Sequence, residues 1–324
     1  MGDSSGGMNL AELNAEILAM PEHRLYQQLH GFSLSIYIFD RNFVDLKSLI
    51  EFLIKDPRAR RLTASRNRDQ LQTVQQEIIR FLHNFVAAAQ SLIDHTRKLH
   101  TKLYGESDFP EYQQRVDSEF KNDPLSQFVK CLRQYAEHYK APEVVVVSAL
   151  SRNDAETTQR RSVELLLEDL QAFEGWTSKA KEYLGTQKRG IDVLELASVY
   201  RQKVLDFYDW FHSCQMRTHA VELGRLGQKQ TEYGMLLLEL KVNACLLGKE
   251  NAGFKGEDIF AGLLASREIE QLERLPPMSP DRATLAIKLL NVRFPVQEAV
   301  SKKIELLYRE PSFTSHCAYR HPST

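Results

Sequence analysis

The segment from Arg66 to Leu103 constrains the fold most, because it contains neither glycine nor proline. Apolar side chains recur along it every three or four residues, which predicts one continuous α-helix about 57 Å long. The stripe runs through Leu71, Ile78, Leu82, Phe85, Ala89, Leu92, Thr96, Leu99 and Leu103. A flank of Ile79, Val86 and Ile93 widens the apolar face beyond a two-stranded seam. We therefore expect this helix to pack inside a bundle.

Helical spacing dominates the remaining sequence as well. Helices are expected over residues 10–20, 42–54, 112–120, 124–139, 170–184, 191–226, 233–247, 257–275, 281–290 and 295–308. Asp123 and Pro124 form a helix start signal, with the aspartate as N-cap. The four valines from Val144 to Val147 favour a strand, with residues 162–167 as its partner. The predicted fold is a mostly α-helical bundle with two long helices, a small inserted β-hairpin near residues 143–168 and a helical C-terminal region.

Glycines at positions 224, 227 and 234 mark a predicted boundary near residue 228. We expect a flexible leader over residues 1–8, the helical bundle over 9–227, a helical region over 228–310 and a flexible tail over 311–324. The start of the chain lacks the basic and apolar regions of a signal peptide. The tail residues His316, Cys317 and His321 fit no standard zinc spacing, so no metal and no cofactor are expected.

Composition restricts the class of protein. The 324 residues are 43% hydrophobic and 26% charged, with a formal net charge of −1. These values exclude a wholly disordered chain and a globally basic nucleic-acid binder. Four scattered cysteines build no disulfide framework, which predicts reduced thiols and a cytoplasmic protein. No apolar run reaches the ~18 residues of a membrane span, so no membrane association is expected.

Arg133 and His138 are the first candidate for chemistry, near the end of a predicted helix. Their residue types suit RNA cleavage without a metal, because an imidazole can move the proton of a 2′-hydroxyl and a guanidinium can hold phosphate oxygens. Positions five apart lie about 140° apart on a helix. The pair would have to converge at a frayed helix end or act with a second subunit. The structural alternative is an ion pair between Arg133 and Glu137, with His138 favoured by the helix C-terminus.

A family resemblance rests on two stretches. They are Asp94-His95-Thr96-Arg97 on the long helix and Leu132-Arg133-Gln134-Tyr135-Ala136-Glu137-His138-Tyr139 before Pro142. Over roughly residues 40–226 the chain resembles the HEPN superfamily, and more narrowly a group of uncharacterised bacterial proteins within it. The resemblance implies a metal-independent endoribonuclease in which Arg133 and His138 are catalytic and face their copies across a homodimer. Many such enzymes are toxins or anti-phage defence effectors, whereas inactive HEPN-like domains serve in binding. Gln134 stands where the family usually has Asn, Asp or His.

Asp94, His95, Arg97, Gln134 and Tyr135 are predicted to line the Arg133/His138 site. For Asp94 and Arg97, three residues apart, the alternative is a structural ion pair beside the core. A separate basic run leads into the long helix and is a predicted RNA contact, with a solvated loop as its alternative. The run comprises Arg58, Arg60, Arg61, Arg66 and Arg68. The alternative function is a non-catalytic helical scaffold for a protein partner, or an RNA-binding protein, acting through its amphipathic helices and this run.

Overall fold

The computed structural model describes residues 9–63, 65–105, 109–153, 156–249, 259–260 and 262–309, which leaves the predicted leader and tail outside the described residues. The mostly α-helical class with a small hairpin is confirmed. The chain divides into a larger unit, Tyr26–His219, and a smaller unit that joins the described residues up to Leu25 to those from Ala220 onward. This division differs from the predicted one, which kept the first helix with the bundle and placed the boundary at residue 227.

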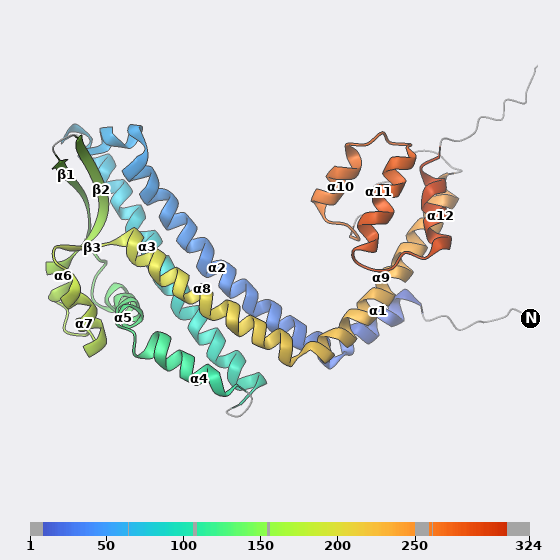
Figure 1. Ribbon diagram of the computed structural model, residues 1–324, viewed down its shortest axis with the longest axis horizontal. Helices are drawn as coiled ribbons and strands as arrows, with labels where there is room; N and C mark the ends of the chain where they lie inside the picture. The colour runs from blue at the N-terminus through green and yellow to red at the C-terminus, as the bar shows by residue number, and fades with distance from the viewer. Residues whose placement is uncertain are drawn as a thin grey trace, which may run out of the picture. The chain divides into compact units, whose positions relative to one another are not determined.

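Three long helices form most of the larger unit: α2 (Pro21–Lys55), α3 (Arg68–Leu103) and α8 (Val193–Thr218) (Figure 1). The first residues of α2, up to Leu25, belong to the smaller unit. The three helices meet in an aromatic core. The Phe85 ring of α3 lies 5.1 Å from Phe39 of α2 and 6.2 Å from Tyr200 of α8, measured between centroids. All three side chains are almost completely buried. The long helix predicted from Arg66 to Leu103 is thus confirmed, and its stripe faces this core.

Two predicted helix boundaries are wrong. α2 begins at Pro21 and not at Asn42, because proline is favoured in the first helical turn and Phe32 continues the core face ahead of Phe39. The helix predicted over 191–226 is interrupted at His219, which leaves helical geometry at φ −103° and ψ 19°. Its imidazole Nε2 lies 3.2 Å from the Tyr104 hydroxyl. A tertiary contact, and no helix-breaking residue, accompanies this interruption.

Short elements complete the larger unit. They are the 3₁₀ turns η1 (Pro57–Thr63) and η2 (Ser65–Asn67), α4 (Pro110–Val116), the π-helical turn η3 (Asp117–Lys121), α5 (Pro124–His138), α6 (Leu167–Gln171) and α7 (Ser178–Thr186). Asp123 caps α5 as predicted, because its side chain accepts the Ser126 N–H at 2.8 Å. The helix predicted over 170–184 is two helices. Gly175 lies between them, where an added Cβ would come within 2.3 Å of the Phe173 ring.

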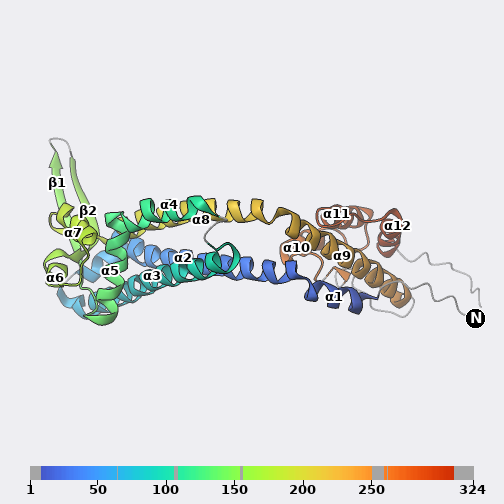
Figure 2. The same cartoon turned by 90° about the horizontal axis from the view of Figure 1, so that it is seen from below.

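The predicted hairpin is present as β1 (Val144–Asn153) and β2 (Glu156–Leu166), antiparallel, with Val144 opposite Leu165. Figures 1 and 2 both show it at one end of the three long helices. A third strand, β3 (Gly190–Asp192), pairs with β2 and was not predicted. At three residues it carries no periodic signal, so only its pairing with β2 makes it a strand.

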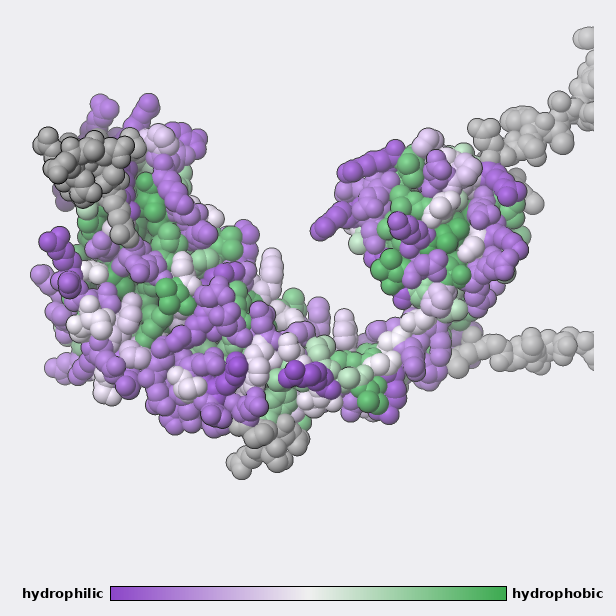
Figure 3. All heavy atoms as spheres, viewed as in Figure 1, coloured by the Kyte–Doolittle hydropathy of each residue, from purple (hydrophilic) through white to green (hydrophobic). Residues whose placement is uncertain are grey.

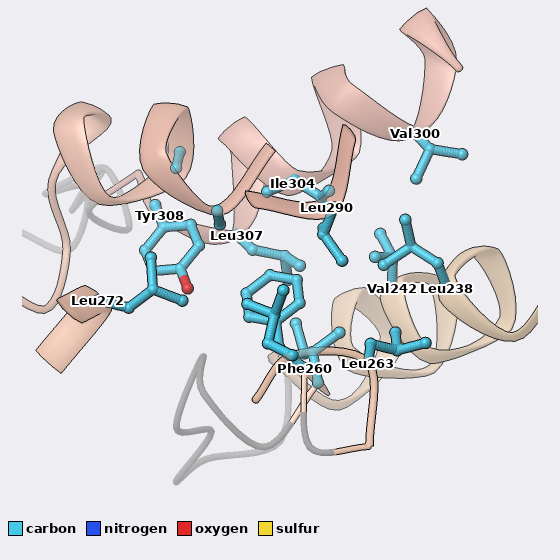
Figure 4. Close-up of a cluster of buried hydrophobic side chains, with 14 of the residues drawn as sticks. Leu238, Val242, Phe260, Leu263, Leu272, Leu290, Val300, Ile304, Leu307 and Tyr308 are labelled. Carbon is cyan, nitrogen blue, oxygen red and sulfur yellow. The ribbon is translucent and has the colours of Figure 1, made fainter. Parts of the chain in front are cut away.

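The smaller unit consists of α1 (Leu10–Ala19), α9 (Ala220–Lys249), α10 (Ser266–Glu273), α11 (Pro280–Asn291) and α12 (Glu298–Leu307). Its main core gathers Leu238 and Val242 of α9 with Leu290 and Ile304 of the following helices (Figure 4). A second cluster joins Leu13 and Ile17 of α1 to Leu226 of α9. The predicted helix over 233–247 is part of α9. The one predicted over 257–275 is reduced to α10 within the described residues.

Among the helices of the described ranges, none combines the length and hydrophobicity that crossing a bilayer requires.

Candidate functional site

The end of α5 positions the predicted catalytic pair. Arg133 is partly exposed and forms an ion pair with Glu137, one turn further along the helix. Its Nε donates to Glu137 Oε1 at 2.9 Å, and its Nη2 lies 2.8 Å from Oε2. This fork-shaped contact is the ion pair foreseen as the structural alternative. Both groups are near solvent, and exposed pairs of this kind contribute at most about 1 kcal/mol to stability.

His138 is the last residue of α5, and its side chain is 74% exposed. Its Nε2 lies 3.9 Å from Glu137 Oε2, the same oxygen that Arg133 contacts. Arg133 and His138, about 140° apart on an ideal helix, therefore meet at one carboxylate. Within a single chain, the side chains of Arg133 and His138 thus both lie within 4 Å of the Glu137 carboxylate. From the sequence, Glu137 was expected only as an ion-pair partner of Arg133.

Tyr135 does not face solvent beside this pair but is fully buried, against Trp176 and Phe173. Its hydroxyl donates to Asp169 Oδ2 at 2.8 Å, and Asp169 also holds Lys140. Burial acts to raise the pKa of Asp169, but the hydrogen bonds from Lys140 and Tyr135 outweigh it and lower that pKa. Tyr135 thus anchors the end of α5, while its neighbour Gln134 is exposed.

The Asp94–Arg97 stretch belongs to other contacts. His95 Nδ1 lies 2.8 Å from the Ser35 hydroxyl of α2. Asp94 Oδ1 accepts a hydrogen bond from Gln90 Nε2 at 3.0 Å. The same oxygen lies 3.7 Å from Arg97 Nη1, which makes an ion pair. In the part of the chain that the structure describes, no hydrogen bond or ion pair joins this stretch to Arg133 or His138. These contacts therefore do not place Asp94, His95 and Arg97 around Arg133 and His138, where they were predicted to lie.

Arg97 instead lines a cavity of about 350 Å³ between α3, α4 with its π-helical turn, α5 and α8. Aromatic and aliphatic side chains form most of its walls. The Tyr208 hydroxyl lies 2.7 Å from the hydroxyl of Thr96, which donates to the Leu92 carbonyl. Lys121 and Lys130 also line the cavity. Local spacing does not reveal this cavity, because five elements contribute side chains to it. The one available signal was a polar Thr96 within an apolar stripe.

The basic run lies in the 3₁₀ turns η1 and η2 and at the first residue of α3. Arg61, Arg66 and Arg68 are exposed, whereas the side chain of Arg60 lies outside the described residues. Arg58 Nη2 lies 2.6 Å from Asp56 Oδ2, and the hydrogen bond from Arg58 lowers the pKa of Asp56. Two turns into α3, the side-chain amide of Gln75 donates to the Val144 carbonyl at 2.8 Å. This bond places the first turns of α3 beside the strand that follows α5.

Comparisons of the chain with protein-family models, with curated proteins and with solved structures found no match. The resemblance to the HEPN superfamily therefore stays a prediction from the two sequence stretches. The candidate site depends on its own geometry.

Proposed function

We propose that the larger unit acts on RNA as a HEPN-like, metal-independent endoribonuclease, with Arg133 and His138 as its functional pair. The observation that carries the proposal is their convergence on Glu137 at an exposed helix end. In the proposed reaction His138 accepts the proton of a 2′-hydroxyl, and the 2′-oxygen attacks the adjacent phosphorus. The 5′-oxygen leaves with a proton from solvent, and Arg133 neutralises the charge on the phosphate oxygens.

Glu137 has a specific place in this proposal. Its carboxylate occupies the N–H edge of the guanidinium that a phosphate would bind, since both anions bind arginine through two oxygens. Because an exposed ion pair contributes little free energy, a phosphate of the RNA can displace Glu137 from Arg133. Glu137 then competes with substrate, and its removal is expected to strengthen RNA binding.

The basic run supports the same proposal. Arg61, Arg66 and Arg68 have exposed side chains, and the bond from Gln75 to Val144 brings the start of α3 beside the segment that follows His138. We infer that RNA bound at Arg133 extends towards these arginines. Such contacts to phosphates weaken steeply as salt is raised.

A toxin or defence effector of this type would act in the cytoplasm. The described cysteines Cys131 and Cys214 carry free thiols. Free thiols fit a reducing compartment. The proposal therefore places the protein in the cytoplasm and predicts slower growth of a host that expresses it.

The test is incubation of the full chain with total RNA in EDTA, scored for cleavage. Arg133→Ala and His138→Ala should each reduce the cleavage rate at least about 100-fold. Arg80→Ala is the matched control, because Arg80 forms a similar exposed pair with Glu77, at 2.6 Å. Glu137→Gln should raise RNA affinity, and Gln134→Asn should raise the rate by restoring the residue usual in the family.

Wild-type protein that is folded but cleaves no RNA, with or without a cellular extract, would contradict the nuclease proposal. RNA binding that persists without cleavage and depends on Arg61, Arg66 and Arg68 would establish the RNA-binding alternative instead. Equal cleavage by wild type and both variants would place the activity elsewhere or in a contaminant.

A further inference from the structure

The outer face of α2 carries a second apolar pattern besides its core face. Leu34, Ile38 and Phe52 are 50%, 53% and 37% exposed, while Phe39 and Ile50 on the core face are completely buried. Together with three polar residues they make a seam with alternating spacings of four and three, as in a coiled coil. The seam consists of Leu34, Ile38, Arg41, Asp45, Ser48 and Phe52. In Figure 3, hydrophobic spheres interrupt the polar surface along the edge that α2 forms in Figure 1.

The seam is symmetric about position 43. Leu34 and Phe52 are equally far from it in opposite directions, as are Ile38 and Ser48, and Arg41 and Asp45. A second α2 that runs antiparallel, centred on the same position, would place Leu34 opposite Phe52 and Arg41 opposite Asp45. A parallel copy would place Arg41 opposite Arg41 and Asp45 opposite Asp45, which is repulsive. The charge pattern is therefore complementary to an antiparallel copy of itself.

We propose that the seam binds the same seam of a second copy of this chain, in antiparallel orientation. Within one chain, Arg41 Nη2 lies 2.9 Å from Asp45 Oδ1, and the two side chains are 58% and 35% exposed. Two such pairs brought together form a closed ring of four alternating charges at the centre of the contact. Leu34 meets Phe52 of the second copy at both ends. The paired stretch from Leu34 to Phe52 is about 27 Å long.

The inference does not rest on the proposed ribonuclease activity, because α2 carries none of the residues assigned to that reaction. The two proposals can fail separately. A dimer lost through seam variants reports on α2, whereas RNA cleavage reports on Arg133 and His138.

The first test is sedimentation velocity of the full chain over a range of concentrations. We expect a concentration-dependent dimer whose dissociation constant rises at least about tenfold in Leu34→Asp and in Ile38→Asp. Val199→Asp is the matched control, since Val199 is 51% exposed on α8, outside the seam. Tryptophan fluorescence of each variant checks that the larger unit remains folded. A chain that stays monomeric, or a dimer that ignores the seam variants, would overturn the proposal.

Charge exchange tests the orientation. Arg41→Glu alone and Asp45→Arg alone each place like charges opposite one another, so each should weaken the dimer. The double variant Arg41→Glu/Asp45→Arg restores opposite charges in an antiparallel pair and should recover it. Failure of the double variant to recover the dimer would contradict the antiparallel charge ring.

Cysteine crosslinking gives an independent measure of the register. A chain with both Ile38→Cys and Ser48→Cys should form a disulfide-linked dimer on mild oxidation, because these positions face each other across the antiparallel pair. Ser48→Cys alone should not, and the wild type controls for the four native cysteines. Crosslinking by Ser48→Cys alone would indicate a parallel pair and overturn the proposed arrangement.

Discussion

In the larger unit one continuous stretch of chain supplies the core, whereas in the smaller unit α1 from the beginning of the chain packs on α9 from its last third. The two cores also differ in composition. Phe39, Phe85 and Tyr200 join the long helices through ring contacts, while aliphatic side chains predominate around Val242 and Ile304. The long helices of the larger unit thus pack around a group of large rings. The helices of the smaller unit pack mainly through aliphatic side chains.

This difference is measurable because Trp176 and Trp210, the two tryptophans of the chain, both lie in the larger unit. Tryptophan fluorescence therefore reports on the larger unit alone. Far-ultraviolet circular dichroism reports on the helices of both units. Comparing the two signals separates effects on one core from effects on the other.

The largest effect is expected for Phe85→Ala, at the centre of the aromatic core. Phe85 is 1% exposed, and removing such a ring costs about 3–5 kcal/mol of unfolding free energy. The fluorescence-detected urea transition should move to lower urea, while a second transition in circular dichroism stays in place. Phe81→Ala, half-buried on the same helix, should cause a smaller loss. Equal shifts in both signals would show that the units unfold as one.

A close contact in the smaller unit gives the next effect. A Cβ added at Gly234 would lie 2.8 Å from the Phe294 ring, but one added at Gly227 on the same helix would meet nothing within 4 Å. Gly234→Ala should cost about 1–3 kcal/mol through overpacking. Gly227→Ala should gain about 0.5–1 kcal/mol from helix propensity. Circular dichroism should detect both changes with unaltered fluorescence, and the same sign for both would refute the contact.

Alkaline pH should affect the larger unit through Tyr104 and Tyr183. Burial raises the pKa of Tyr104 and of Tyr183 to about 12, from an ordinary 10.0. A pKa that is higher in the folded state gives stability that is complete below pH 10.0 and is lost as the pH rises towards 12. Fluorescence-detected stability should therefore fall over this interval. Tyr183→Phe should make the fall shallower, and an unchanged slope would show that Tyr183 ionises freely.

The smallest effect is expected at acid pH in the smaller unit. Arg293 donates to both oxygens of Glu268, at 2.9 and 2.5 Å, and these bonds lower the pKa of Glu268. A lowered folded-state pKa gives stability that is present above the ordinary value of 4.5 and is lost as the pH falls below it. Glu268→Gln should cost about 0.2–1 kcal/mol at neutral pH. The difference from wild type, read by circular dichroism, should vanish at low pH. A pH-independent difference would point to packing instead.

The sequence by itself determined the helical class, the long α3, the start of α5 and the hairpin, since each depends on periodicity, capping or β-branched side chains over neighbouring residues. It also singled out Arg133 and His138. Only the tertiary structure decided that α8 ends at Thr218, just before His219 and its contact with Tyr104. The packing of α1 on α9 and the burial of Tyr135 were likewise decided only by the tertiary structure. These features arise from contacts between residues far apart in the chain, which local spacing does not record.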